Sequence, residues 1–172
     1  MKLTLLRHAK SSWNDESLSD FDRPLNRRGI RDAPDMAQRL KDANCHAQRL
    51  LCSPALRTRQ TSDHFAATLD IKAEERILVP EIYEASAGTL IEVIAQHGQT
   101  ADELLLIGHN PGIEYLSAML NGGERLAVAT CTVCRFDISG IDDWRMLANA
   151  GSRLLFYDFP KNQSNAGNSA DA

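Results

Sequence analysis

Arginine and histidine side chains recur at three places where they could handle a phosphoryl group. Arg7-His8 follows a short aliphatic run, Arg57 follows a second run, and His109-Asn110 follows a third. Guanidinium groups bind phosphoryl oxygens through paired hydrogen bonds, and a neutral histidine can attack phosphorus as a nucleophile. A lone histidine after a strand is usually a packing residue. Two such histidines at equivalent strand ends, accompanied by arginines, indicate a functional site instead.

Parallel strands would bring these three groups together. Aliphatic runs predict short strands over residues 2–6, 49–52, 77–79 and 104–107. In open α/β sheets, ligands bind beyond the carboxyl ends of the parallel strands. We therefore expect Arg7-His8, Arg57 and His109-Asn110 to line one crevice. Helix amino-termini near Pro54 and Pro111 should point their N–H groups toward it and favour an anion.

Helical periodicity alternates with these strands. Ile30, Ala33, Ala37 and Leu40 lie at spacings of three and four, which predicts a helix over 29–40 with Pro34 in its first turn. Ser53-Pro54 is expected to cap and open a helix ending near residue 69. Further helices are predicted over 89–97 and 111–120, and a pair of strands over 128–138 and 144–149. This order predicts a three-layer α/β/α sandwich whose mainly parallel central sheet has an antiparallel edge.

Length and composition limit the classes of function. The 172 residues are 43% hydrophobic and 24% charged, which fits one domain over residues 1–160 and a disordered polar tail over 161–172. The net charge of −4 argues against nucleic acid or an anionic membrane as a partner. The sequence has neither a membrane-spanning apolar run nor a signal-peptide pattern, so we expect a cytoplasmic protein.

Four segments carry a resemblance to a known family: residues 6–13 (LRHAKSSW), 21–25 (FDRPL), 53–61 (SPALRTRQT) and 108–111 (GHNP). Together they resemble the histidine phosphatase superfamily, also called phosphoglycerate mutase-like, and within it the SixA-type phosphohistidine phosphatase branch. The resemblance extends from residue 2 to about residue 159. It implies a phosphoglycerate mutase-like fold.

The resemblance also implies roles for individual residues. His8 would be the nucleophile, and Arg7 and Arg57 would bind the phosphoryl group. His109 and Asn110 would complete the phosphate-binding pocket. Arg23 matches a further phosphate-binding arginine. The alternative for Arg23 is a solvated loop residue paired with Asp20 or Asp22. Many family members have glycine where this chain has Ala9, although the backbone carbonyl there could still orient the ring of His8.

The chemistry of these residue types supports the same assignment. Arginines and histidines around the phosphoryl oxygens can supply the stabilisation that a metal would otherwise provide, so we expect neither a metal nor a cofactor. His8 must be neutral to attack, and neighbouring guanidiniums should lower its pKa. A hydrogen bond from one ring nitrogen to a backbone carbonyl would leave the other free to form a phosphohistidine intermediate.

A general acid would separate the possible substrate classes. An alkoxide leaving group needs a strong acid, whereas imidazole leaving from phosphohistidine hardly does, because its conjugate acid has a pKa of about 6.5. The candidate acids are Glu81, which matches the family's acid better by position, and Glu84. The surrounding segment departs from the esterase pattern, so neither need be catalytic.

Three functions follow from these observations. The first is a metal-independent phosphatase acting on phosphohistidine in a signalling or phosphotransfer protein. The second keeps the chemistry and acts on small phosphate esters or anhydrides, and the third is a phospho-partner binding module without turnover. Mutase activity is the least supported, since no insert for a closed pocket is evident. The expected assembly is a monomer or weak oligomer.

The remaining reactive or aromatic side chains are expected to be structural. Cys131 and Cys134 lie in a predicted strand, where positions three apart face opposite sides, and no partner completes a zinc set. Trp144 is expected to pack in the core or at an edge. Trp13 follows the nucleophile segment and could line the entrance to the pocket. The other histidines, His46, His64 and His97, are expected at the surface.

Overall fold

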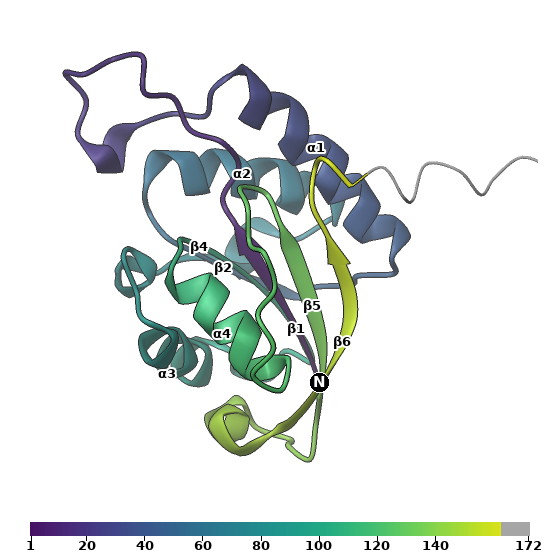
Figure 1. Cartoon of the computed structure of the whole chain (residues 1–172). Helices are drawn as coiled ribbons and strands as arrows, with labels where there is room; N and C mark the ends of the chain where they lie inside the picture. The colour runs from purple at the N-terminus through teal and green to yellow at the C-terminus, as the bar shows by residue number, and fades with distance from the viewer. Residues whose placement is uncertain (163–172) are drawn as a thin grey trace, which may run out of the picture.

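The aliphatic runs form a six-stranded sheet in the computed structural model, which describes residues 1–162 (Figure 1). The strand order is β3-β2-β4-β1-β5-β6, with β1 to β4 parallel and β5 and β6 antiparallel to their neighbours. The strands are β1 (Lys2–Arg7), β2 (Arg49–Cys52), β3 (Arg76–Leu78), β4 (Glu103–Gly108), β5 (Val133–Ser139) and β6 (Gly151–Asp158).

Helices cover both faces of this sheet (Figure 1). One face packs against α1 (Arg27–Asp42) and α2 (Leu56–Thr68), and the other against α3 (Ala87–His97) and α4 (Gly112–Leu120). Alternation along the strands divides the core in two, because successive side chains point to opposite faces. Leu106 belongs to the cluster with α3 and α4, whereas Ile107 belongs to the cluster with α1 and α2. The predicted three-layer α/β/α sandwich with an antiparallel edge is confirmed.

Short 3₁₀ helices lie in the connections between these elements. They are η1 (Asp20–Asp22), η2 (Ala73–Glu75), η3 (Pro80–Ile82) and η4 (Trp144–Asn149). Two of these helices, η1 after β1 and η3 after β3, lie in connections that begin at the carboxyl ends of the parallel strands, where the predicted site residues also lie. The connections therefore matter for the site as much as the strands do.

The first helix differs from its prediction at its start and on its buried face. It begins at Arg27 because the Asn26 side chain caps it, with Oδ1 accepting from Gly29 N at 2.9 Å. Pro34 therefore lies inside the helix, where it removes the hydrogen bond to the Ile30 carbonyl. Ile30 is 55% exposed rather than buried, and Pro34 is also exposed, so water can satisfy that carbonyl.

The expected opening of the second helix at Ser53-Pro54 is wrong. The helix begins at Leu56, and its N-cap is Ala55, which makes no side-chain cap. The hydroxyl of Ser53 accepts from the Ala55 N–H at 3.4 Å, just before the helix, and lies 2.8 Å from His109 Nε2. The Ser53 oxygen therefore contacts a buried imidazole as well as the backbone at the start of α2.

The C-terminal strands also depart from the prediction. Residues 144–149 form the 3₁₀ helix η4, because Trp144 turns inward and its indole N–H donates to the Ala101 carbonyl at 2.7 Å. The second strand of the predicted pair is instead β6, a half-exposed edge strand that pairs antiparallel with β5 and whose alternation is weak in sequence. β5 itself begins only at Val133, and the five residues before it form a loop beside the site.

The cysteines are buried, as expected. Cys131 packs on the side of α1 and α2, and Cys134 packs on the side of α3 and α4. Burial raises the pKa of Cys45 and of Cys52 to about 12 and that of Cys134 to about 11, which keeps these thiols protonated at neutral pH.

Within residues 1–162, no helix is long and apolar enough to cross a membrane. The predicted disordered tail lies mostly outside the described residues, since only its first two positions, Lys161 and Asn162, are placed.

Candidate active site

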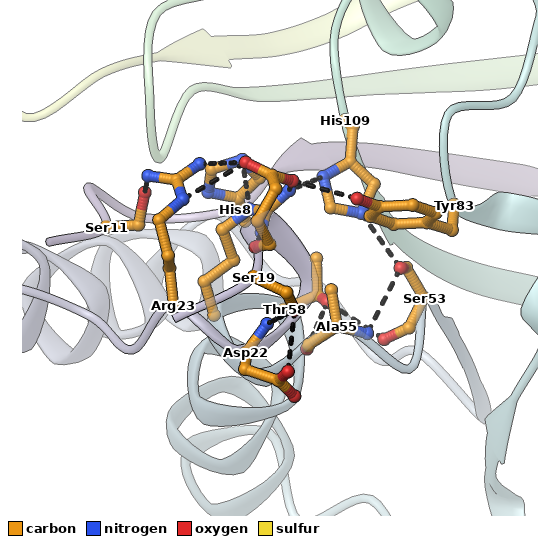
Figure 2. Close-up of polar contacts among 12 residues, drawn as sticks. His8, Ser11, Ser19, Asp22, Arg23, Ser53, Ala55, Thr58, Tyr83 and His109 are labelled. Carbon is orange, nitrogen blue, oxygen red and sulfur yellow. Dashed lines mark hydrogen bonds and ion pairs between the residues drawn. The ribbon is translucent and has the colours of Figure 1, made fainter. Parts of the chain in front are cut away.

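The strand register brings the two histidines side by side. Arg7 at the end of β1 pairs with Gly108 at the end of β4, so His8 and His109 leave neighbouring strands at the same level. Their ring centroids are 5.1 Å apart. Figure 2 shows His8 between Arg23 and His109, with Tyr83 beside the second histidine.

Arg57 links the two rings. It lies in the first turn of α2, which begins beyond the end of the neighbouring strand β2. Its Nε is 3.3 Å from His8 Nε2, and its Nη2 is 3.3 Å from His109 Nδ1. The three polar groups predicted to share one crevice are therefore in contact with one another.

A backbone carbonyl fixes the orientation of His8. Its Nδ1 lies 2.7 Å from the Ala9 carbonyl, which can only accept, so Nδ1 carries the proton. The Ala9 amide is held in turn by Thr61 Oγ1 at 3.1 Å. Nε2 is consequently the unprotonated nitrogen, and it faces Arg57. The structure thus contains the carbonyl contact that the sequence predicts for this ring.

His8 is held in its neutral form mainly by burial. Loss of solvent lowers its pKa to about 3, the hydrogen bond to Ala9 opposes this shift, and the charges of Arg57 and Arg7, with that of His109 when it is protonated, reinforce it. The expected lowering of the pKa is confirmed, but the guanidiniums are a smaller cause than burial.

His109 is also neutral in this arrangement. Because Arg57 can only donate, Nδ1 of His109 accepts, and its Nε2–H is left to donate to Ser53 Oγ. Burial, followed by the charge of Arg57, lowers the pKa of His109 to about 4. A dianion arriving at this ring would favour the protonated form, which donates from both nitrogens.

Arg7 and Asn110 retain buried polar atoms without protein partners. Arg7 Nη1 donates to the Val128 carbonyl at 2.9 Å, and Asn110 Nδ2 donates to the same carbonyl at 3.0 Å. Among the described residues, Arg7 Nε and Asn110 Oδ1 have no hydrogen-bond partner. The unpaired guanidinium N–H is a donor that a phosphoryl oxygen could use.

Arg23 reaches the same place from the loop before α1. Its Nη1 donates to Ser11 Oγ at 2.9 Å, and its Nε donates to Asp20 Oδ1 at 3.0 Å. The guanidinium also lies 3.6 Å from the centroid of the Trp13 ring, which is 69% exposed. Arg23 therefore forms the ion pair weighed as its alternative and also lines the cavity.

These side chains surround a polar cavity of about 330 Å³. Among the candidate residues, Arg7, His8, Arg23, Arg57, His109 and Asn110 line it. Both candidate acids are exposed, but only Glu84 lines the cavity. The structure therefore brings the second acid candidate to the cavity and leaves the first outside. A larger cavity of about 390 Å³ between α2 and β3 contains none of the predicted site residues.

Three contributors have no role in the site predicted from sequence: Asp20, Ser53 and Tyr83. The sequence suggests Asp20 only as a partner of Arg23, and Ser53 only as a helix cap. The Tyr83 hydroxyl donates to Asp20 Oδ2 at 2.9 Å, and its ring packs edge-on against His109. No pattern in the sequence could single out Tyr83, because its position depends on how η3 follows β3. Within residues 1–162, no group of three or more His, Cys, Asp or Glu side chains could hold a metal ion.

The depressed histidine pKa values predict a pH-dependent stability. In the unfolded chain both histidines become protonated below about pH 6.5. In the folded protein, with pKa values of about 3 for His8 and about 4 for His109, they stay neutral to a much lower pH. The free energy of unfolding should therefore decrease as the pH is lowered through this range, by about 1.4 kcal/mol per pH unit for each histidine. Urea unfolding at pH 6.5 and at pH 5 measures this effect in wild type and His8→Gln. Between pH 6.5 and pH 5, wild type should lose about 2 kcal/mol more of its free energy of unfolding than the variant does. Parallel pH profiles would contradict this account.

Comparison with known proteins decides the family. Residues 3–104 match the family model of the histidine phosphatase superfamily (branch 1). The chain belongs to this superfamily. It is 39% identical over 139 residues to an uncharacterised protein of Mycobacterium tuberculosis, covering 79% of this chain and 84% of that one.

The histidine phosphatase also resembles SixA proteins. It is 29% identical over 126 residues to phosphohistidine phosphatase SixA of Escherichia coli, covering 72% of this chain and 76% of that protein. The solved structure of the protein histidine phosphatase SixA with tungstate superimposes with a TM-score of 0.76 at 22% identity, covering 93% and 97% of the two chains. The structural match shows a shared fold, and membership of the histidine phosphatase superfamily supports a phosphatase.

Proposed function

We propose that this phosphatase hydrolyses phosphohistidine in a signalling or phosphotransfer protein, without a metal and through a phosphohistidine at His8. The observation that carries the proposal is the fixed ring of His8. Its Nδ1–H is bound to the Ala9 carbonyl, and its Nε2 faces the arginine-lined cavity. The similarity to SixA supports the substrate class.

In the first step, the lone pair of His8 Nε2 attacks phosphorus and the P–N bond of the substrate breaks. The departing imidazole leaves as a neutral ring when its other nitrogen carries a proton, so no general acid is required. His8 keeps its proton on Nδ1 and becomes a phosphorylated imidazolium. The Ala9 carbonyl stabilises that charge, while Arg7, Arg57 and Arg23 bind the phosphoryl oxygens.

In the second step, water attacks phosphorus and the P–Nε2 bond breaks. The electron pair returns to Nε2, which regenerates the neutral ring, and the product is dihydrogen phosphate, which loses a proton to solvent. Dividing one displacement into two lowers the barrier of each. The imidazole of His8 leaves readily from the cationic phosphoimidazolium because it departs as a neutral ring.

Glu84 favours a second candidate function, the hydrolysis of small phosphate esters. Its place in the cavity wall would allow it to protonate an alkoxide. For phosphohistidine, we expect Glu84→Gln to change turnover by less than about threefold, because imidazole needs no acid. Turnover of a phosphohistidine peptide and a sugar phosphate should be compared in wild type, Glu84→Gln and the exposed-residue control Glu81→Gln, with a chelator present.

Each result of this comparison has a defined meaning. Fast sugar phosphate turnover that falls about 100-fold in Glu84→Gln would favour the ester phosphatase. Loss of phosphohistidine turnover in the chelator would overturn the metal-independent mechanism. Tight phosphate binding with no release from either substrate would leave only the phospho-partner binding module.

A further inference from the structure

The carboxylate of Asp20 accepts hydrogen bonds from two of the active-site arginines, Arg57 and Arg23. Asp20 Oδ2 accepts from Arg57 Nη2 at 2.8 Å, and Asp20 Oδ1 accepts from Arg23 Nε at 3.0 Å. Arg23 Nη2 also donates to Oδ1, and Arg57 Nη1 donates to the Asp20 carbonyl. A bridging carboxylate between two guanidiniums presents its oxygens as a phosphoryl group would.

The donor groups of the three arginines are unequally used. Arg57 directs Nε, Nη1 and Nη2 to His8, His109 and Asp20. Arg23 directs its nitrogens to Asp20, Ser11 and the Ser12 carbonyl. Arg7 alone among them has a buried N–H without a protein partner within residues 1–162. A phosphoryl group that uses all three arginines must therefore compete with Asp20.

The carboxylate is charged and placed where it can move. Its partial burial acts to raise the pKa of Asp20, but hydrogen bonds from Arg23 and Tyr83 and the charge of Arg57 lower it to about 2. Its side chain is 45% exposed and lies in η1, within a largely exposed loop. An anion in this position cannot act as a general acid at neutral pH. If the Asp20 side chain turns outward, water can hydrate its carboxylate in place of the arginines.

We propose that the Asp20 carboxylate is a built-in competitor for the phosphoryl site, displaced when the substrate binds and returning to help expel the product phosphate. A dianion attracts the guanidiniums more strongly than one carboxylate does, so the substrate can displace it. After hydrolysis, the tethered carboxylate returns at a high effective concentration and weakens the hold on phosphate. Product release limits many enzymes, and three arginines would otherwise retain phosphate. The role rests on the proposed function only in taking the bound anion to be a phosphoryl group.

Inorganic phosphate binding tests this role directly. Titration calorimetry at pH 7 should show phosphate binding to Asp20→Asn about tenfold more tightly than to wild type, a change of about 1.4 kcal/mol. Asp22→Asn is the matched control, because Asp22 loses the same charge in the same turn and contacts Ser19 rather than an arginine. Its phosphate affinity should stay within about twofold of wild type.

Tyr83→Phe separates the loss of a contact from the loss of a charge. It removes the hydroxyl that donates to Asp20 Oδ2 and leaves the carboxylate charged. Phosphate should bind about two- to threefold more tightly, since the competitor is less firmly held. This variant also keeps the test available if Asp20→Asn does not fold.

Unchanged or weaker phosphate binding in folded Asp20→Asn would overturn the proposal and make Asp20 a residue that positions the arginines. The readout needs no turnover. A wild-type protein that binds phosphate but hydrolyses no phosphohistidine would therefore refute the proposed function alone.

Discussion

Replacing His8 with glutamine is expected to lower phosphohistidine turnover by about 10⁴-fold or more, because the variant has no atom that can carry the phosphoryl group. Glutamine can occupy similar space and keep a polar atom near Arg57. Rapid quench with a labelled phosphohistidine peptide should place label on the wild-type protein and none on His8→Gln. The quench must avoid acid, since a P–N bond would hydrolyse in it.

His46→Gln is the matched control for this experiment. His46 is exposed and does not line the active-site cavity, so its replacement should leave both turnover and labelling unchanged. If His8→Gln still became labelled, the phosphoryl group would have to be carried elsewhere. The covalent mechanism at His8 would then be wrong.

Arg57→Lys is expected to lower kcat/KM for phosphohistidine by about 10²- to 10³-fold. Lysine keeps one charge but loses the planar fork that reaches His8, His109 and Asp20 together. Because the fork contacts both imidazoles, the loss should appear in kcat as well as in KM. Steady-state kinetics with the phosphohistidine peptide measures both constants.

Arg59→Lys provides the comparison on the same helix. Arg59 is exposed and lines the separate cavity beside β3, so its replacement should change kcat/KM by less than about twofold. Equal losses in the two variants would mean that helix α2 responds to any arginine replacement. The assignment of Arg57 to the reacting phosphoryl group would then fail.

Short-range patterns in the sequence determined most of the framework. Alternating aliphatic runs and helical spacings predict β1, β2, β4, α3 and α4 to within a few residues, because a buried strand or a one-sided helix must repeat its apolar residues at the period of its backbone. The rule that ligands bind beyond parallel strand ends then predicts that His8 and His109 meet.

Only the tertiary structure decided which further side chains reach the cavity. Glu81 and Glu84 lie three positions apart in one segment, and the course of the chain through η3 turns Glu84 toward the site. Asp20 meets Arg57 across 37 positions of sequence because η1 folds back over α2. Long-range contacts of this kind depend on loop conformation, which has no repeating pattern for the sequence to reveal. The same reason accounts for Ser53, whose hydroxyl contacts the imidazole of His109, 56 positions away in the sequence.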